Sequence, residues 1–239
     1  MIATWINAAL VLVGSVIGLL FKSKISARFS AVITQALALC VLGIGISNVL
    51  QSTDTLCVII CIVLGTLIGE ALKIEDRLDA AGEFLRRKLV RENSSSRFTE
   101  GFVTATLLYC IGAMAITGSI EAGLNHNYSI IISTGVIDGV TSISFAAAMG
   151  VGVAFSIIPL MIYQGAITLL ATVVGPYLGE IVIAGMTATG GTLIMGLAVN
   201  MLNIPNVKIK VGNMLPAIFL PIAYYPILNL IQQLIAKLG

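Results

Sequence analysis

Asp138 is the residue with the clearest chemical potential, because it lies inside the apolar stretch SIIISTGVIDGVTSISFAAAMGVGVAFS (Ser129–Ser156). The stretch is long enough to cross a bilayer, since about 20 apolar residues span the hydrocarbon layer. A carboxylate in mid-membrane costs at least about 2.5–3.5 kcal/mol, so it normally faces a protein interior or a wet cavity. Asp138 is therefore a candidate proton or cation site. The alternative is a structural acid bonded to backbone amides at a helix break.

Hydroxyl and amide side chains elsewhere in the chain could complete a site around this acid. Ser142 and Ser144 follow Asp138 in the same stretch and could coordinate a small cation, or bond to their own helix backbone. Gln164 and Asn7 carry amides, which both donate and accept hydrogen bonds. These two amides could line the site or simply hold two helices together.

A second glycine-rich run, GMTATGG (Gly185–Gly191), also contains hydroxyl groups. It resembles the unwound segment of a discontinuous transporter helix, whose free backbone groups bind ions or carboxylates. Close helix packing explains the same pattern equally well. The predicted substrate or ion site comprises Asp138, Gln164, Asn7, Thr187, Thr189, Ser142 and Ser144.

The other reactive residue types do not form a catalytic or metal-binding pattern. The chain lacks a Walker phosphate loop, a His-Glu-x-x-His motif and a Gly-x-Ser-x-Gly motif. Cys57 and Cys61 lie on one helical face without a neighbouring histidine or third thiol, so we expect them to be buried apolar side chains. Glu70 lies within helical reach of Lys73, so we expect its side chain to extend to the membrane interface rather than to take part in transport. We therefore expect no enzyme activity, no cofactor and no metal.

The composition indicates a membrane protein. The 239 residues are 58% hydrophobic and only 10% charged, whereas soluble domains carry about 25% charged residues. Backbone amides in lipid must be satisfied internally, and long apolar runs favour helices over the alternating strands of a barrel. The expected fold is an all-α polytopic transmembrane helix bundle of about eight spans.

The expected spans divide the chain into four parts. Residues 1–72 form three spans, 73–97 an amphipathic surface helix with its linker, 98–156 a central pair of spans, and 157–239 three more. The fifth span is rich in glycine and could instead be a re-entrant hairpin. The expected spans are Ile2–Phe21, Ser30–Leu50, Leu56–Leu72, Phe98–Ile120, Ser129–Ser156, Ile157–Leu178, Ile181–Leu202 and Met214–Ile235.

The positions of lysine and arginine predict the orientation of these spans. The links at 22–28, 73–97 and 203–213 hold twelve of the thirteen positive residues. With eight spans, these three links fall on one side, which we call the basic side. The positive-inside rule places the basic side in the cytoplasm and both termini outside.

Spans 1 to 3 resemble spans 6 to 8. The alignment places INAALVLVGSVIG (Ile6–Gly18) over YQGAITLLATVVG (Tyr163–Gly175), so that Asn7 corresponds to Gln164. An offset of five spans reverses the direction of each helix, so these halves would be inverted-topology repeats. Secondary transporters commonly use this plan, with the substrate site at the repeat interface. The alternative is chance similarity between apolar helices of simple composition.

The chain resembles the YqgA/YdfK family of bacterial inner-membrane proteins, and the resemblance covers essentially its whole length. It implies a bacterial plasma-membrane location. The family is one of unknown function, loosely described as possible transporters, and it supplies no site residue. The segments that carry the resemblance are MAITGSIEAGL (Met114–Leu124), the Asp138-Gly139 pair, GVGVAFSIIPLMIYQGAITLLA (Gly150–Ala171) and MTATGGTLIMGLAVNML (Met186–Leu202).

Together these patterns predict a small secondary transporter of an unknown ion or small polar solute, with Asp138 as proton or cation site. One alternative is a passive channel in which Asp138 acts as a selectivity group. Another is a non-transporting membrane scaffold or sensor that binds partners through the amphipathic helix at 74–90. The expected partners are the lipid bilayer, the solute and a second copy of the chain, which Gly-x-x-x-Gly faces could hold. No nucleic-acid partner is expected.

Overall fold

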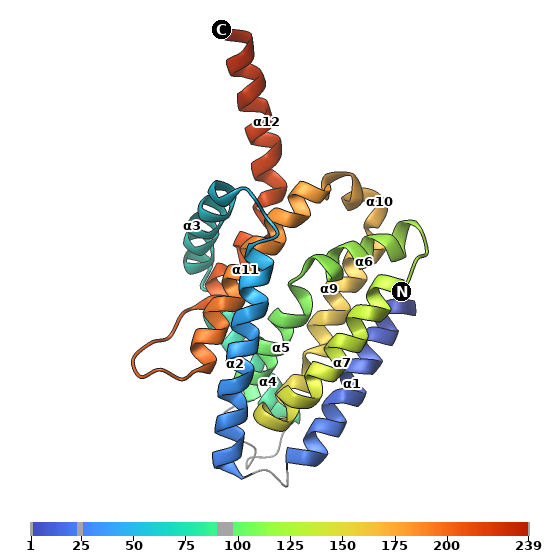
Figure 1. Ribbon diagram of the computed structural model, residues 1–239, viewed down its shortest axis with the longest axis vertical. Helices are drawn as coiled ribbons and strands as arrows, with labels where there is room; N and C mark the ends of the chain where they lie inside the picture. The colour runs from blue at the N-terminus through green and yellow to red at the C-terminus, as the bar shows by residue number, and fades with distance from the viewer. Residues whose placement is uncertain (1, 23–25, 90–97, 239) are drawn as a thin grey trace.

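The protein is an all-α bundle in the computed structural model, which describes residues 2–22, 26–89 and 98–238 (Figure 1). In this part of the chain, six helices are long and apolar enough to cross a membrane, or up to eight if each of two bent pairs is one span. The predicted polytopic helix bundle is therefore confirmed. The helices are α1 Ile2–Lys22, α2 Ala27–Val49, α3 Thr55–Leu72, α4 Ile74–Leu89, α5 Phe98–Cys110, α6 Ala113–Leu124, α7 Ser129–Met149, α8 Gly152–Phe155, α9 Ile157–Leu169, α10 Ala171–Val174, η1 Gly175–Tyr177, α11 Glu180–Met201, η2 Val211–Phe219 and α12 Pro221–Leu238.

Helices α1 and α7 lie side by side and run in the same direction (Figure 1). Asn7 faces Gly135 near the start of both helices, and Gly14 faces Gly139 one to two turns further on. A Cβ atom on Gly14 would overlap the backbone carbonyl of Gly139. The absence of side chains at these positions lets the two backbones touch, as in other glycine-mediated membrane helix pairs. Parallel α1 and α7 also agree with the eight-span topology.

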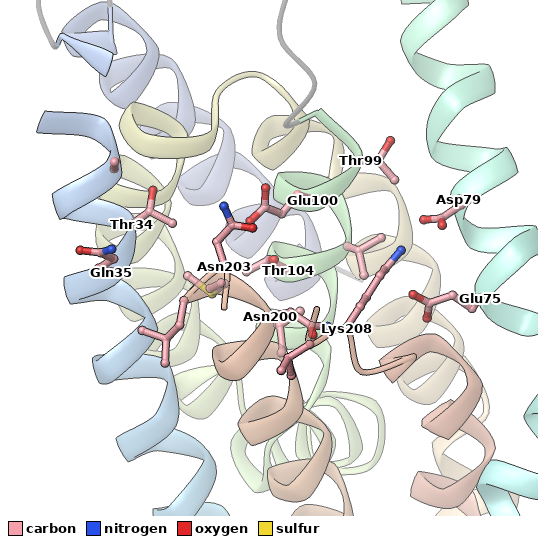
Figure 2. Close-up of a pocket in the computed structure, with 16 residues that line it drawn as sticks. Thr34, Gln35, Glu75, Asp79, Thr99, Glu100, Thr104, Asn200, Asn203 and Lys208 are labelled. Carbon is pink, nitrogen blue, oxygen red and sulfur yellow. The ribbon is translucent and has the colours of Figure 1, made fainter. Parts of the chain in front are cut away.

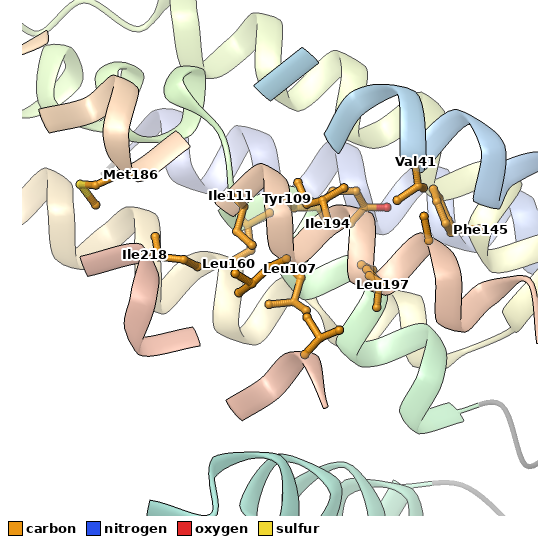
Figure 3. Close-up of a cluster of buried hydrophobic side chains, with 14 of the residues drawn as sticks. Val41, Leu107, Tyr109, Ile111, Phe145, Leu160, Met186, Ile194, Leu197 and Ile218 are labelled. Atoms are coloured by element: carbon orange, nitrogen blue, oxygen red, sulfur yellow. The ribbon is translucent and has the colours of Figure 1, made fainter. Parts of the chain in front are cut away.

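Helix α11 lies at the centre of the bundle. Within its apolar window 72% of the residues are buried, the largest fraction among the candidate spans. It packs antiparallel to α2, where a Cβ on Gly191 would lie 2.7 Å from the Gly45 carbonyl oxygen. On its other sides, Leu107, Leu160 and Ile194 belong to a continuous apolar core that joins α5, α9 and α11 (Figure 3).

Of the two explanations of GMTATGG, an unwound segment and close helix packing, the structure supports the second. This run lies inside α11, which is helical from Glu180 to Met201. Its glycines instead admit neighbours, since Gly190 faces the side chain of Ile111 and Gly191 faces α2. A glycine-rich sequence in a membrane helix can either unwind the helix or let neighbouring helices approach. In α11 it lets α2 approach.

The breaks in the bundle occur in two other spans. The expected fourth span is divided into α5 and α6, which meet at an angle of 60° around Ile111 and Gly112. The expected eighth span is divided into η2 and α12, bent by 46°. Pro216 lies within η2, and Pro221 begins α12, which extends away from the bundle (Figure 1). Proline lacks the amide proton that a continuing helix needs, which explains the second break.

Two further span boundaries differ from the prediction. Helix α7 is continuous over Ser129–Met149 and contains no hairpin, but it ends at Gly150 rather than Ser156. The next span therefore starts earlier, at Gly152, and reaches Leu169. The remainder of the expected sixth span consists of the short elements α10 and η1.

The predicted amphipathic helix is present as α4, and the linker that follows it to residue 97 lies outside the described residues. The first turn of α4 is anchored to η2. The Glu75 backbone amide donates to Asn213 Oδ1 at 2.7 Å, and the Glu75 carboxylate accepts a hydrogen bond from the Gly212 amide at 2.6 Å. Helix α4 is therefore attached to the bundle as well as amphipathic.

Glu70 pairs with Lys210 of the link before η2. Glu70 accepts hydrogen bonds from Lys210 Nζ at 2.9 Å and from Asn213 Nδ2 at 2.6 Å. Lys73 ends α3 in the left-handed conformation and turns the chain into α4. The link before η2 thus supplies the cationic partner of Glu70, although Lys73 is nearer in the sequence.

The α1–α7 contact predicts opposite effects for two glycine substitutions. Gly14→Ala should lower the free energy of unfolding by about 1–3 kcal/mol, because the new methyl group overlaps the α7 backbone. Gly43→Ala is the matched control in α2, where a Cβ meets no atom of residues 2–22, 26–89 or 98–238 within 4 Å. Alanine there should be neutral or stabilising by about 0.5–1 kcal/mol. Thermal unfolding in detergent would measure both, and equal melting temperatures would contradict the packing.

Candidate functional site

Three of the predicted site residues meet in the interior of the bundle. Asn7 of α1 donates one hydrogen bond through Nδ2 to Gln164 Oε1 of α9 at 3.1 Å, and another to Asp138 Oδ2 of α7 at 3.4 Å. All three side chains are buried. We call these residues the amide–carboxylate cluster. The contact between Asn7 and Gln164 that the repeat alignment implies is present, and their role in binding stays a prediction.

Glycines in α7 bring the cluster together. Gly135 lies one turn before Asp138, and its missing side chain leaves space for the Asn7 backbone, 3.0 Å from where a Cβ would lie. Gly139 likewise admits the backbone of Leu10. Because α1 approaches α7 this closely, the short side chain of Asn7 can reach both Asp138 and the amide on α9.

The cluster retains unused hydrogen-bonding capacity. Asn7 Oδ1 and Gln164 Nε2 have no hydrogen-bond partner among the described residues. Leaving a buried donor or acceptor without a partner costs about 1–3 kcal/mol. The cluster therefore offers one free acceptor and one free donor beside a carboxylate. This arrangement brings hydrogen-bonding groups of both kinds to a carboxylate in the interior.

The two serines of the predicted site separate. Ser142 is buried one turn after Asp138, and its hydroxyl donates to the carbonyls of Val11 at 3.1 Å and Gly139 at 2.7 Å. It therefore joins α7 to α1, which is a structural role. Ser144 lies on the exposed face of α7. The structure does not bring Ser144 to the cluster.

The two threonines of α11 are both buried, and no hydrogen bond joins either one to the cluster in the described part of the chain. The Thr189 hydroxyl donates to the Gly185 carbonyl of its own helix at 2.8 Å. The Thr187 hydroxyl has no partner among the same residues. Their predicted place in one pocket with Asp138 depended on an unwound α11, and that helix is continuous.

A polar pocket on the basic side was missed by the sequence reasoning. It has a volume of about 640 Å³ and lies between α2, α4, α5, the end of α11 and the loop to Lys208 (Figure 2). We call it the basic-side pocket. Its polar lining residues occupy helix ends and links, where they individually resemble solvated surface groups. The available signal was their concentration beside the basic links, as in the pairs Thr34-Gln35 and Thr99-Glu100.

The cluster predicts an energetic coupling between Asn7 and Gln164. Asn7→Ala and Gln164→Ala should each destabilise the protein. Their effects should differ from additivity by about 0.5–3 kcal/mol, because each removes the partner of the other. A double-mutant cycle of unfolding in detergent measures this coupling. The Asn7→Ala/Ser144→Ala pair is the control and should be additive, whereas additivity in both cycles would contradict the cluster.

Comparison with known proteins identifies relatives along nearly the whole chain. The family model described as "Protein of unknown function (DUF554)" matches residues 2–226. The "Uncharacterized membrane protein YdfK" of Bacillus subtilis (strain 168) is 32% identical over 225 residues, covering 92% of this chain and 94% of the relative. The "Uncharacterized protein YqgA" of Escherichia coli (strain K12) is 29% identical over 222 residues, with the same coverage. No solved structure matches. The chain is a multi-pass membrane protein and belongs to the DUF554 family.

Proposed function

We propose that this protein is a small secondary transporter of an ion or small polar solute in the bacterial inner membrane. The observation that carries the proposal is the amide–carboxylate cluster, in which Asp138, Asn7 and Gln164 from three apolar helices meet in the interior. Ionisable residues inside membrane spans are expensive and typically mark ion or substrate pathways. The proposal includes no enzymatic reaction, and it places both termini outside.

In this proposal Asp138 alternates between a protonated form and an ionised form that binds a cation. The Asn7 amide donates a hydrogen bond to this carboxylate. Gln164 Nε2 and Asn7 Oδ1, which have no hydrogen-bond partner among the described residues, supply a donor and an acceptor for the solute. Coupling follows if protonation and solute binding favour different access states of the bundle.

The proposal also retains the inverted repeat. Each helix of the first repeat touches its expected counterpart, through Asn7 and Gln164, through Gly45 and Gly191, and through Gly65 and Ala217. Asn7 and Gln164 are themselves aligned residues. Aligned residues of inverted repeats can touch only where the pseudo-two-fold axis passes between them. Transporters of this plan bind their substrates near such an axis, which supports the cluster as the site.

A ligand screen with an Asp138→Asn variant tests the proposal. We expect an ion or small metabolite to raise the melting temperature of the detergent-purified protein, and Asp138→Asn to abolish the shift. A ligand at about one hundred times its dissociation constant adds roughly 2.7 kcal/mol to the stability. The screen is run at a mildly acidic and a mildly alkaline pH, because protonation of Asp138 competes with cation binding. Ser144→Ala, on the exposed face of α7, should keep the response.

The same ligand is then tested in proteoliposomes. A transporter should give saturable uptake that depends on a counter-ion gradient, whereas a channel should conduct without coupling. If no compound binds and transport is absent, the non-transporting alternative replaces the proposal. If uptake is the same in Asp138→Asn, the cluster is not the coupling site.

A further inference from the structure

Each helix of the amide–carboxylate cluster carries a buried threonine one turn away from its cluster residue. The spacing is three residues in α1 and four residues in α7 and α9. Side chains at these spacings lie on one face of a helix, about 5–6 Å apart, and can therefore act on the same ligand. We call these threonines the threonine layer, and in the order α1, α7 and α9 they are Thr4, Thr134 and Thr168.

The threonine layer lies on the side of the cluster that is opposite the basic side. Helices α1 and α7 run in the same direction, and Thr4 and Thr134 both precede the cluster residue of their helix. Helix α9 runs the opposite way (Figure 1), and its Thr168 follows Gln164. The three threonines are thus displaced from the cluster towards the same end of the bundle. Thr4 belongs to the first turn of α1, so this layer is close to that end.

The threonine layer adds unpartnered oxygen atoms to the cluster. The Oγ1 atoms of Thr4 and Thr168 have no hydrogen-bond partner in the described part of the chain, and the same is true of Asn7 Oδ1. The Thr134 hydroxyl donates to the Ile130 carbonyl of its own helix at 2.9 Å, and its oxygen keeps lone pairs that can face a ligand. Buried polar atoms without a partner are rare in proteins and call for a bound water or ion. Several of them in adjacent turns indicate a ligand that accepts electron pairs from oxygen.

The charge of this region favours a monovalent cation. Asp138 is the one ionisable residue among the six residues of the cluster and the threonine layer. A single carboxylate neutralises one positive charge, whereas a calcium ion takes six to eight oxygen ligands that normally include several carboxylates. No group of three or more His, Cys, Asp or Glu side chains among residues 2–22, 26–89 and 98–238 is placed to hold a metal ion. Carboxylate, amide and hydroxyl oxygens are ligands for a hard cation of low charge.

The residual exposure of the side chains indicates the direction of entry. Asp138 keeps 7% of its surface exposed, Thr134 8% and Thr168 7%. On the basic side of the cluster, Ser142 and Val11 are completely buried, and the Ser142 hydroxyl is bonded to the Val11 carbonyl at 3.1 Å. The contact between the backbones of α1 and α7 continues from there towards the basic side. A small ion therefore meets less obstruction through the threonine layer.

We propose that the amide–carboxylate cluster and the threonine layer together bind a small monovalent metal cation of the Na⁺ class, which enters from the end opposite the basic side. The Asp138 carboxylate supplies the negative charge. Asn7 Oδ1 and the hydroxyl oxygens of Thr4, Thr134 and Thr168 supply neutral ligands. This inference rests on the proposed transport function and names the ion of that same site.

Thermal unfolding of the full chain in detergent tests the ion, with sodium chloride compared with choline chloride at equal ionic strength and mildly alkaline pH. Sodium should raise the melting temperature saturably, and choline should not. Thr4→Val and Thr168→Val should each lose most of the sodium-specific shift, because a methyl group cannot coordinate a cation. Without sodium, both variants should melt at or above the wild-type temperature, because valine removes a buried hydroxyl that has no partner. A purely structural threonine would give the opposite result.

Two variants serve as controls. Thr187→Val also removes a buried hydroxyl without a partner among the described residues, but from α11, where no such bond joins it to the cluster. It should keep the full sodium response. Thr168→Ser keeps the oxygen atom and should also keep the response, which separates the role of the hydroxyl from that of packing.

Three outcomes would overturn the inference. Equal melting temperatures in sodium and choline chloride would exclude a metal-cation site, while an Asp138-dependent ligand from the metabolite screen would leave transport of another solute standing. A sodium response that is lost in Asp138→Asn but intact in both valine variants would exclude the threonine layer and leave the cluster as the transport site. A saturable response to magnesium chloride in place of sodium, or equal loss in Thr187→Val, would contradict a specific monovalent site.

Discussion

The direct contact between the backbones of α1 and α7 is the constraint on which the rest of the interior depends. Glycines at positions 14, 135 and 139 remove the side chains that would hold the helices apart. Lipid gives no hydrophobic drive for helix association, so close packing and hydrogen bonds between helices must supply it. The same contact brings Asn7 to Asp138. One turn later, the Ser142 hydroxyl of α7 donates a hydrogen bond to the Val11 carbonyl of α1. The close packing of α1 against α7 therefore also assembles the amide–carboxylate cluster.

A second anchor organises the basic side. Glu70 and Glu75, on either side of the turn between α3 and α4, hold the segment Lys210–Asn213 through one ion pair and several hydrogen bonds. This anchor fixes α4 beside α5 and so forms one wall of the basic-side pocket. The bundle thus has two polar regions, one in its interior and one at its basic end, each held by a different set of helices.

The two broken spans are the pairs α5–α6 and η2–α12, whereas the glycine-rich helix α11 is continuous. The α5–α6 bend occurs around Ile111, whose side chain lies against Gly190 of the continuous helix α11. The central helix is thus continuous, while the chain bends by 60° between α5 and α6 beside it. The glycines of α11 make room for its neighbours: Gly191 admits the backbone of α2, and Gly190 admits the side chain of Ile111.

The sequence by itself determined the membrane class, the helical architecture, the approximate spans and the position of an acid, Asp138, within one of them. These follow from hydropathy and from the rule that backbone groups in lipid are satisfied within a helix, which is a local property of the chain. The repeat alignment also paired Asn7 with Gln164. The tertiary structure alone decided that Thr187, Thr189 and Ser144 lie apart from them, that Glu70 pairs with Lys210, and that polar helix ends enclose a pocket. These outcomes depend on which helices pack against one another, and the hydropathy of a segment does not reveal which other helix it will contact.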